Sequence, residues 1–136
     1  MPAPMADDGQ PLLIAIDDRQ TDAIDIDGLR ALARECLVGE GVVDAELSIS
    51  FATEDEIADL HRRYLQQDGP TDVLSFPLDD EAGEDGLRML GDVVISPAVA
   101  ARNNSDDPGS ELRLLLVHGI LHLLGHDHME QADRAT

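Results

Sequence analysis

An apolar segment near the end of the chain constrains the fold more than any other feature of the sequence. It starts at Asp107-Pro108, where an N-cap aspartate precedes a proline suited to the first helical position, and it runs to about Leu124. Gly125 follows as the left-handed residue that commonly ends a helix. Large aliphatic residues occur on nearly every side of this predicted helix: Leu112, Leu114, Leu115, Leu116, Val117, Ile120, Leu121, Leu123 and Leu124. Such a helix is expected to lie buried at the centre of a domain.

Strand and helix patterns alternate along the rest of the chain. Apolar runs or alternating residues predict strands over 12–16, 46–51, 73–76 and 93–95. Helical spacing and helix-start signals predict helices over 27–38, 54–65 and 97–103. The order β-α-β-α-β-β-α-α predicts an α+β fold, in which a small central mixed sheet carries packed helices and the buried apolar helix.

Local signals set the ends and faces of two of these helices. Gly39 and Gly41 end the first one. The second opens on a capping box, Thr53 followed by Glu56. Its apolar spacing is expected to turn three residues inward: Ile57, Leu60 and Tyr64.

Length and composition indicate one folded domain. The chain has 136 residues, of which 43% are hydrophobic, so we expect residues 1–10 to form a flexible tail and residues 11–136 a single domain. The stretch 79–86 is expected to be an acidic loop. The single cysteine, Cys36, excludes an internal disulfide and lies on an apolar helical stripe as a small core residue.

The same composition predicts a cytoplasmic protein. No apolar run approaches the roughly 20 residues that a membrane span requires. Residues 1–10 contain two aspartates and no basic residue, unlike a secretory signal.

The formal net charge of −20 is unusual. All nine basic residues are arginine, and residues 109–136 contribute only four acids and two arginines, a net −2, so the acidic excess lies mostly before the last helix. Taken alone, the charge argues against a nucleic-acid partner, because phosphate binding favours a basic surface. We interpret it as a solvated acidic surface, such as a salt-adapted organism would have, rather than as part of a site.

Four of the five histidines fall within residues 118–128. His118 and His122 are four residues apart on the predicted helix, so they project from one side and can bind the same metal at roughly 2.0–2.1 Å. After Gly125 the chain turns back, and a third histidine can complete a zinc site that leaves the fourth position to water. Burying both histidines there without a ligand would cost on the order of several kcal/mol in unsatisfied polar groups.

His126 and His128 compete for the third ligand position. The spacing H-x-x-x-H-x-x-G-x-x-H, with glycine at the turn, favours His128. His126 and Asp127 then become candidates for orienting a ligand or handling protons. The prediction is therefore one zinc ion per chain, bound by His118, His122 and His128 in a zincin-like metal frame.

Peptide cleavage is not indicated, although the metal frame resembles that of zinc proteases. Those enzymes place a glutamate directly after the first histidine as the general base, and here that position is Gly119. Met129 follows the third histidine too closely to form the methionine turn of a metzincin. A phosphodiester, which already carries negative charge, depends less on a carboxylate base.

Three sequence blocks resemble the YbeY family of bacterial endoribonucleases: HGILHLLGHDH at 118–128, PTDVLSFP at 70–77 and LGDVVIS at 90–96. The resemblance implies a zinc-dependent, single-strand-specific endoribonuclease that acts in 16S rRNA 3′-end maturation and ribosome quality control. It also implies an α+β fold, the ligands His118, His122 and His128, and partners among ribosomal proteins and a ribosome-assembly GTPase.

The chain departs from the family pattern at Leu65. Many members have an arginine there, directly after the aromatic residue that is Tyr64 in this chain. Arg62 and Arg63 are either substitutes that reach phosphate or solvated arginines on a charged helix face, and we favour the second interpretation. The chain also ends at Thr136, sooner than the family pattern leads us to expect.

Three polar residues in the sequence blocks 70–77 and 90–96 each have two possible interpretations. Thr71 and Ser75 either line the cleft near the metal or serve turn and strand structure. Asp92 either orients a ligand histidine or ends a turn. No general base is identifiable.

Three functions follow from these residues. The first is a zinc-dependent RNA endonuclease of the small ribosomal subunit. The second is a ribosome-assembly binding factor whose zinc is structural and whose nuclease activity is slight. The third, a metalloprotease, is disfavoured by Gly119.

Overall fold

The computed structural model describes residues 12–42, 44–65, 72–78 and 88–125. Its elements are β1 (Leu12–Asp18), α1 (Ile26–Gly39), β2 (Ala45–Phe51), α2 (Glu54–Leu65), β3 (Val73–Pro77), β4 (Arg88–Ile95), α3 (Pro97–Asn103) and α4 (Pro108–Leu123). This is the predicted order, and the predicted bounds differ by at most two residues except at the start of β4. The predicted tail at 1–10 and loop at 79–86 lie outside the described residues.

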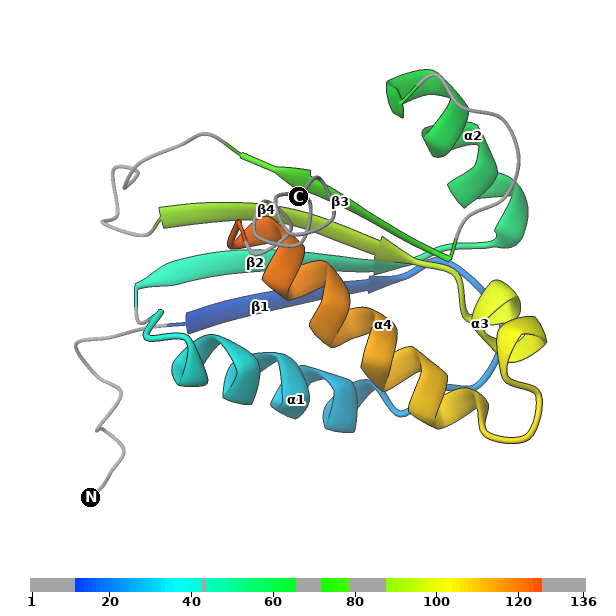
Figure 1. The fold of residues 1–136 in the computed structure, drawn as a ribbon, viewed down its shortest axis with the longest axis horizontal. Helices are drawn as coiled ribbons and strands as arrows, with labels where there is room; N and C mark the ends of the chain where they lie inside the picture. Colours follow the sequence, from blue (N-terminus) through cyan, green and yellow to red (C-terminus); the bar gives the residue numbers. More distant parts are fainter. Residues whose placement is uncertain (1–11, 43, 66–71, 79–87, 126–136) are drawn as a thin grey trace, which may run out of the picture.

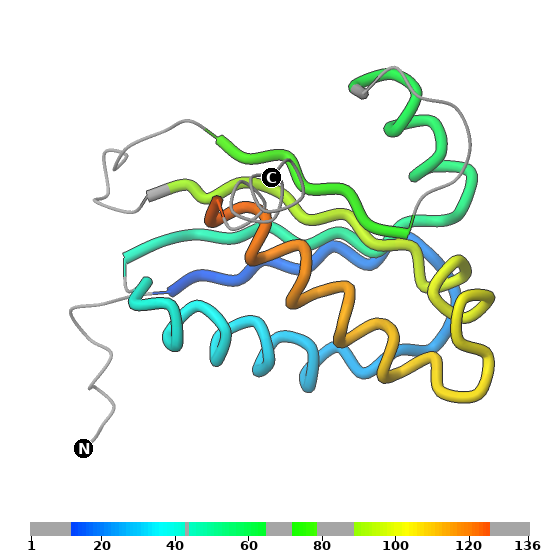
Figure 2. Tube along the Cα trace, viewed as in Figure 1, coloured from blue at the N-terminus to red at the C-terminus, as the bar shows by residue number. Residues whose placement is uncertain are grey.

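The four strands form one mixed sheet in the order β1-β2-β4-β3. β1 pairs with β2, and β2 with β4, in parallel, whereas β3 pairs with β4 in antiparallel orientation. Helices α1 and α4 lie side by side on one face of this sheet, and α2 lies toward the other face (Figure 1, Figure 2). The predicted α+β fold with a mixed sheet and packed helices is confirmed.

The main core lies between the sheet and the two helices α1 and α4. Alternation along β2 sends every second side chain toward these helices, and Leu47, Ile49 and Phe51 are fully buried there. Helix α4 meets them with Leu116 and Ile120, which are also fully buried. This core therefore holds α4 firmly against the sheet.

Helix α4 begins and ends as its sequence predicts. The side chain of Asp107 accepts a hydrogen bond from the backbone N–H of Ser110 at 3.1 Å, and Pro108 occupies the first turn. After Leu124, Gly125 has a positive φ of 96°.

The prediction that α4 is buried on all sides was wrong. Its buried residues line the side facing the sheet and α1: Leu112, Leu115, Leu116, Gly119 and Ile120. On the other side Leu114 is 61% exposed, and His118 is exposed as well. The reason is that a two-layer fold covers α4 from the sheet side only, so the helix forms the outer layer. No helix in the described ranges is long and apolar enough to cross a membrane.

Strand β4 starts five residues earlier than predicted, because Gly91 and Asp92 lie inside the strand. Gly91 has φ 135°, and the register between β2 and β4 shifts next to it. A Cβ at Gly91 would lie 2.3 Å from the carbonyl oxygen of Phe76 on β3. Glycine is therefore required here for an irregular, closely paired strand, not for a turn.

Helix α2 is capped as predicted, but one of its three inward residues is not buried. The backbone N–H of Glu56 donates to the hydroxyl of Thr53 at 3.1 Å, and Ile57 is fully buried. Leu60 is half-buried. Tyr64 turns toward the sheet as predicted and contacts Phe76 of β3, but it is 61% exposed and so does not belong to the buried core.

Cys36 packs partly buried against the main core, as expected for a small residue on the apolar side of α1. Burial raises the pKa of its thiol, and the nearby carboxylate of Glu40 raises it further. A thiol in these surroundings stays protonated and unreactive at neutral pH.

Candidate functional site

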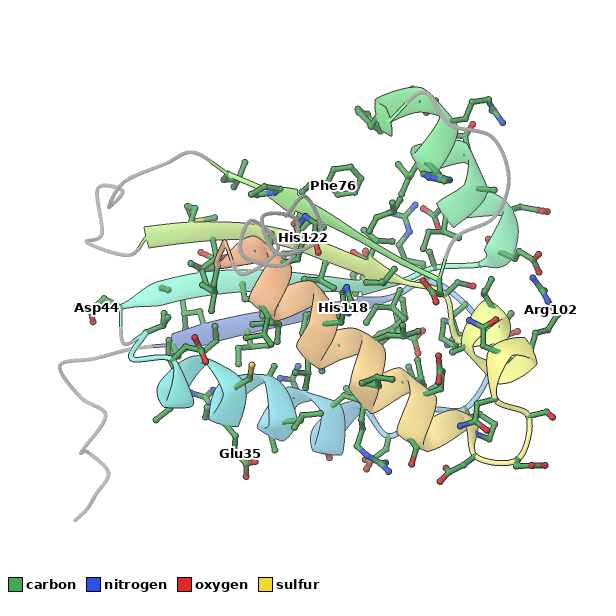
Figure 3. All side chains as sticks on the ribbon, in the orientation of Figure 1. Glu35, Asp44, Phe76, Arg102, His118 and His122 are labelled. Carbon is green, nitrogen blue, oxygen red and sulfur yellow. The ribbon has the colours of Figure 1, made fainter. Side chains whose placement is uncertain are left out.

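The candidate site is centred on His118 and His122 of α4. They are four positions apart, which places both on one side of the helix, and Figure 3 shows both side chains extending from α4 on the side near β3. His118 is exposed and His122 is half-buried. Two imidazoles held one turn apart on a well-packed helix are suited to bind one metal ion.

Gly119 lies between the two histidines and faces the sheet. A Cβ at this position would lie 2.7 Å from Cγ1 of Val93 and 3.2 Å from Cγ2 of Val73. The hydroxyl of Ser75 donates a hydrogen bond to the carbonyl oxygen of Gly119 at 3.0 Å. The glycine thus lets α4 lie directly on β3 and β4, and this contact sets the height of the histidines above the sheet.

The same contact explains why the protease base is missing. A glutamate at position 119 would point into the packed layer between α4 and the sheet, not toward the exposed histidine side. Gly119 is therefore a packing residue, and the metal frame here is built without a carboxylate at that position.

The third predicted ligand, His128, lies outside the described residues, as do His126, Asp127, Met129 and Thr71. Within the described ranges, no three His, Cys, Asp or Glu side chains come together in a group that could hold a metal. The structure thus brings together His118 and His122, and His128 stays a prediction.

Ser75 and Asp92 lie on opposite faces of the sheet. Ser75 pairs with Val93 in register, and its hydroxyl contacts α4 between the two histidines, which is a structural role. Its alternative role in lining a cleft near the metal stays a prediction. Asp92, one residue before Val93, points to the other face, because successive strand residues alternate. It lines a pocket there with Ser50. Asp92 therefore does not end a turn, since it lies inside β4, and it faces away from His118 and His122. A role toward His128 concerns a residue outside the described part of the chain.

Arg62 and Arg63 are surface residues at the end of α2. Both guanidinium groups pair with the carboxylate of Asp59, and the Arg63 pair is 3.3 Å long. Arg63 also lies over the ring of Tyr64, 5.8 Å from its centroid. These contacts favour the interpretation as solvated arginines. The side chain of Leu65 lies outside the described part of the structure.

Sequence reasoning missed a pocket of about 350 Å³ between α2 and the sheet face opposite α4. Its lining residues come from the β1–α1 and β2–α2 connections and from β2, α2, β3 and β4: Arg19, Ser50, Ala52, Glu56, Leu60, Tyr64, Phe76, Asp92 and Val94. The alternation of Ser48 and Ser50 with apolar residues indicated a polar sheet face. The pocket itself depends on where α2 lies, which no local pattern reveals.

The chain resembles known proteins over most of its length. The family model described as Endoribonuclease YbeY matches residues 15–136. A protein named Endoribonuclease YbeY from Acidothermus cellulolyticus is 47% identical over 123 residues, covering 79% of this chain and 75% of the relative. The Salinispora tropica protein of the same name is 41% identical over 121 residues, covering 79% of this chain and 77% of the relative.

Other relatives match over a shorter stretch. The Corynebacterium efficiens protein of that name is 47% identical over 100 residues, which is 65% of this chain. The chain spans about half the length of this relative and of the one from Mycolicibacterium vanbaalenii, 50% and 52%.

One solved structure is similar as well. The solution structure of TM1509 from Thermotoga maritima superposes with a TM-score of 0.58 at 30% sequence identity, covering 83% of this chain and 73% of that one. The similarity thus extends from sequence to fold.

Proposed function

The chain belongs to the YbeY family, and on that premise we propose that it is a zinc-dependent endoribonuclease that cleaves single-stranded RNA. Its proposed substrate is the unprocessed 3′ end of 16S rRNA, with a further role in ribosome quality control. One observation carries the proposal: His118 and His122 lie one turn apart on one side of α4, inside the region that matches the family. We expect it to act in the cytoplasm, with ribosomal proteins and a ribosome-assembly GTPase as partners.

The two described residues of the predicted zinc site, His118 and His122, fit a zinc ion. Imidazole nitrogen is a preferred zinc ligand, and the two histidines are presented from a helix that the core holds in place. Gly125 turns the chain directly after α4, which is where the predicted third ligand, His128, follows in sequence. Zinc bound there would supply Lewis-acid chemistry to a phosphodiester oxygen.

The protein's own residues would hold the reacting group in place. His118 is exposed, so a phosphate of RNA can approach its side of α4 from solvent. Ser75 and Gly119 keep the histidine-bearing turn at a defined distance from β3. Among the described residues, no carboxylate joins the two histidines in a cluster, so we assign no general base.

A second candidate function is a ribosome-assembly binding factor with a structural zinc. Three observations favour it: the arginine common in the family is replaced by Leu65, Arg62 and Arg63 are paired with Asp59, and the net charge is −20. A metalloprotease is disfavoured, because position 119 faces the sheet.

The test is cleavage of a labelled RNA that carries an unprocessed 16S 3′ end, at low and high salt, with zinc content measured on the same samples. The variants are His122→Ala and, as a matched control, His61→Ala on α2. We expect the wild type and His61→Ala to cleave and His122→Ala to lose both zinc and cleavage while keeping its helical circular dichroism. Full cleavage by His122→Ala would refute the assigned site. No cleavage by any variant, with one zinc per wild-type chain, would favour the binding factor.

A further inference from the structure

The pocket between α2 and the sheet lies on the opposite face from the candidate zinc site. Its volume of about 350 Å³ is within the range of small-molecule sites, roughly 300–1,000 Å³. It combines an aromatic wall, a polar floor and, at its edge, an arginine that is paired with a glutamate.

The wall is made by Tyr64 of α2 and Phe76 of β3. Their ring centroids are 5.8 Å apart and their planes meet at 76°, so they contact edge to face. Tyr64 is 61% exposed and Phe76 is half-buried, so ring surface is left open on the pocket side. Open aromatic surface of this kind stacks on planar heterocycles.

The floor is made by Asp92 and Ser50 on the neighbouring strands β4 and β2. Neither side chain makes a hydrogen bond or ion pair with another described residue. An ionised carboxylate is an acceptor only, so Asp92 favours a ligand that presents N–H donors. The Ser50 hydroxyl can both donate and accept beside it.

The edge carries Arg19, which is the one cation among the described lining residues. Its guanidinium pairs with Glu56 at 2.6 Å and with Asp17 at 3.9 Å, yet its side chain stays 54% exposed. Arginine has five N–H donors, so two contacts with carboxylates leave others for a phosphate.

We propose that this pocket binds one unpaired guanine of the RNA substrate, with the ring stacked on the aromatic wall and its Watson–Crick edge on Asp92. The inference rests on the proposed function. Guanine presents two adjacent donors on that edge, the N1–H and the N2 amino group, which match a carboxylate. Adenine and cytosine pair one amino donor with a ring acceptor, and uracil places its N–H between two carbonyls, so each would bring an acceptor against Asp92.

The position of β3 connects the pocket with the zinc site. β3 is an edge strand, and its successive residues Ser75 and Phe76 face α4 and the pocket respectively. An RNA strand that passes over this edge can place one nucleotide in the pocket and another, a few nucleotides away, beside His118 and His122. The pocket then selects which phosphodiester is presented for cleavage.

Binding is measured with a fluorine probe at Tyr64. This is the only tyrosine in the chain, so incorporation of 3-fluorotyrosine yields a single ¹⁹F signal at the pocket. We expect guanosine 5′-monophosphate to shift the signal saturably, with at least about tenfold weaker effects from the adenine, cytosine and uracil nucleotides. Asp92→Asn should remove that preference, whereas Asp106→Asn, an exposed carboxylate on another surface, should retain it.

Several outcomes would overturn the proposal. One is no shift with guanosine 5′-monophosphate, and another is equal shifts with all four nucleotides. A shift with arginine amide but not with the nucleotide would assign the pocket to a basic peptide instead. A shift that disappears in His122→Ala would mean that the probe reports on the zinc site.

A cleavage assay separates failure of this inference from failure of the proposed function. On RNAs that differ only in the position of one guanine, the wild-type cut should move with the guanine, and Asp92→Asn should cut without that preference. Zinc-dependent cleavage that is unchanged by Asp92→Asn would refute the guanine pocket alone. A specific guanine shift without any cleavage would support the pocket and refute the nuclease.

Discussion

Gly119→Ala offers a quantitative test of the contact between α4 and the sheet. The added methyl would lie 2.7 Å from Cγ1 of Val93, 3.2 Å from Cγ2 of Val73 and 3.4 Å from the hydroxyl of Ser75. Overpacking of this kind costs about 1–3 kcal/mol. Alanine gains about 1 kcal/mol of helix propensity over glycine, so the net loss should be about 0–2 kcal/mol.

Gly109→Ala on the same helix provides the control for propensity. Gly109 is exposed, and a Cβ there would meet nothing closer than 3.6 Å. We expect this variant to be neutral or slightly stabilised, so the difference between the two variants isolates a clash of about 1–3 kcal/mol. With a urea m-value of about 2 kcal/mol/M, a 2 kcal/mol difference separates the unfolding midpoints by about 1 M.

A double-mutant cycle identifies the clashing partner. Val93→Ala removes the methyl group nearest the new Cβ, so Gly119→Ala should be less damaging in that background, with a coupling of about 0.5–3 kcal/mol. Urea unfolding followed by circular dichroism measures all four proteins. If Gly119→Ala proved as stable as Gly109→Ala, or if its cost were unchanged without the Val93 side chain, the argument for close packing would fail.

Two further predictions concern single interactions. Ser75→Ala should lower the free energy of unfolding by about 0.5–1.5 kcal/mol, because it removes the hydrogen bond to Gly119. Ser48→Ala, on the opposite face of the sheet, is the control. Equal losses in the two variants would contradict a stabilising role for the Ser75 hydrogen bond. The hydrogen bond from Arg102 holds the pKa of the Glu54 carboxyl below its ordinary 4.5. The ion pair therefore stabilises the fold above pH 4.5, and this stabilisation is lost as the pH falls through the lowered pKa. Glu54→Gln should therefore lose less stability than the wild type when the pH is lowered from neutral to about 3, as measured by urea unfolding. The difference should be small because the pair is exposed. If both proteins lost the same stability, the ion pair would contribute nothing.

The elements that could be predicted carry their signals locally. The bounds of α2 follow from the Thr53 cap and the apolar spacing after it, and those of α4 from Asp107-Pro108 and Gly125. The shared side of His118 and His122 is equally local, because helix geometry alone determines it. These features needed no knowledge of the rest of the fold.

The features that were missed depend on distant parts of the chain. The start of β4 was misplaced because Gly91 resembles a turn residue, whereas its role is a close approach to Phe76 on another strand. The exposure of Leu114 and Tyr64 follows from which surfaces the two layers cover. The face on which Asp92 lies depends on strand register, and without it the aspartate could not be separated from the histidine site.

Helix α4 is the last of the described elements, and this late position has a consequence for folding during synthesis. Leu116 and Ile120 complete the core formed by the parallel strands and α1, so the part of the apolar sheet face that α1 does not cover stays open until α4 has left the ribosomal exit tunnel. Long-range parallel pairing of this kind forms slowly. The helix that closes the core also carries His118 and His122, so a nascent chain cannot present this pair on a packed surface before this core has closed.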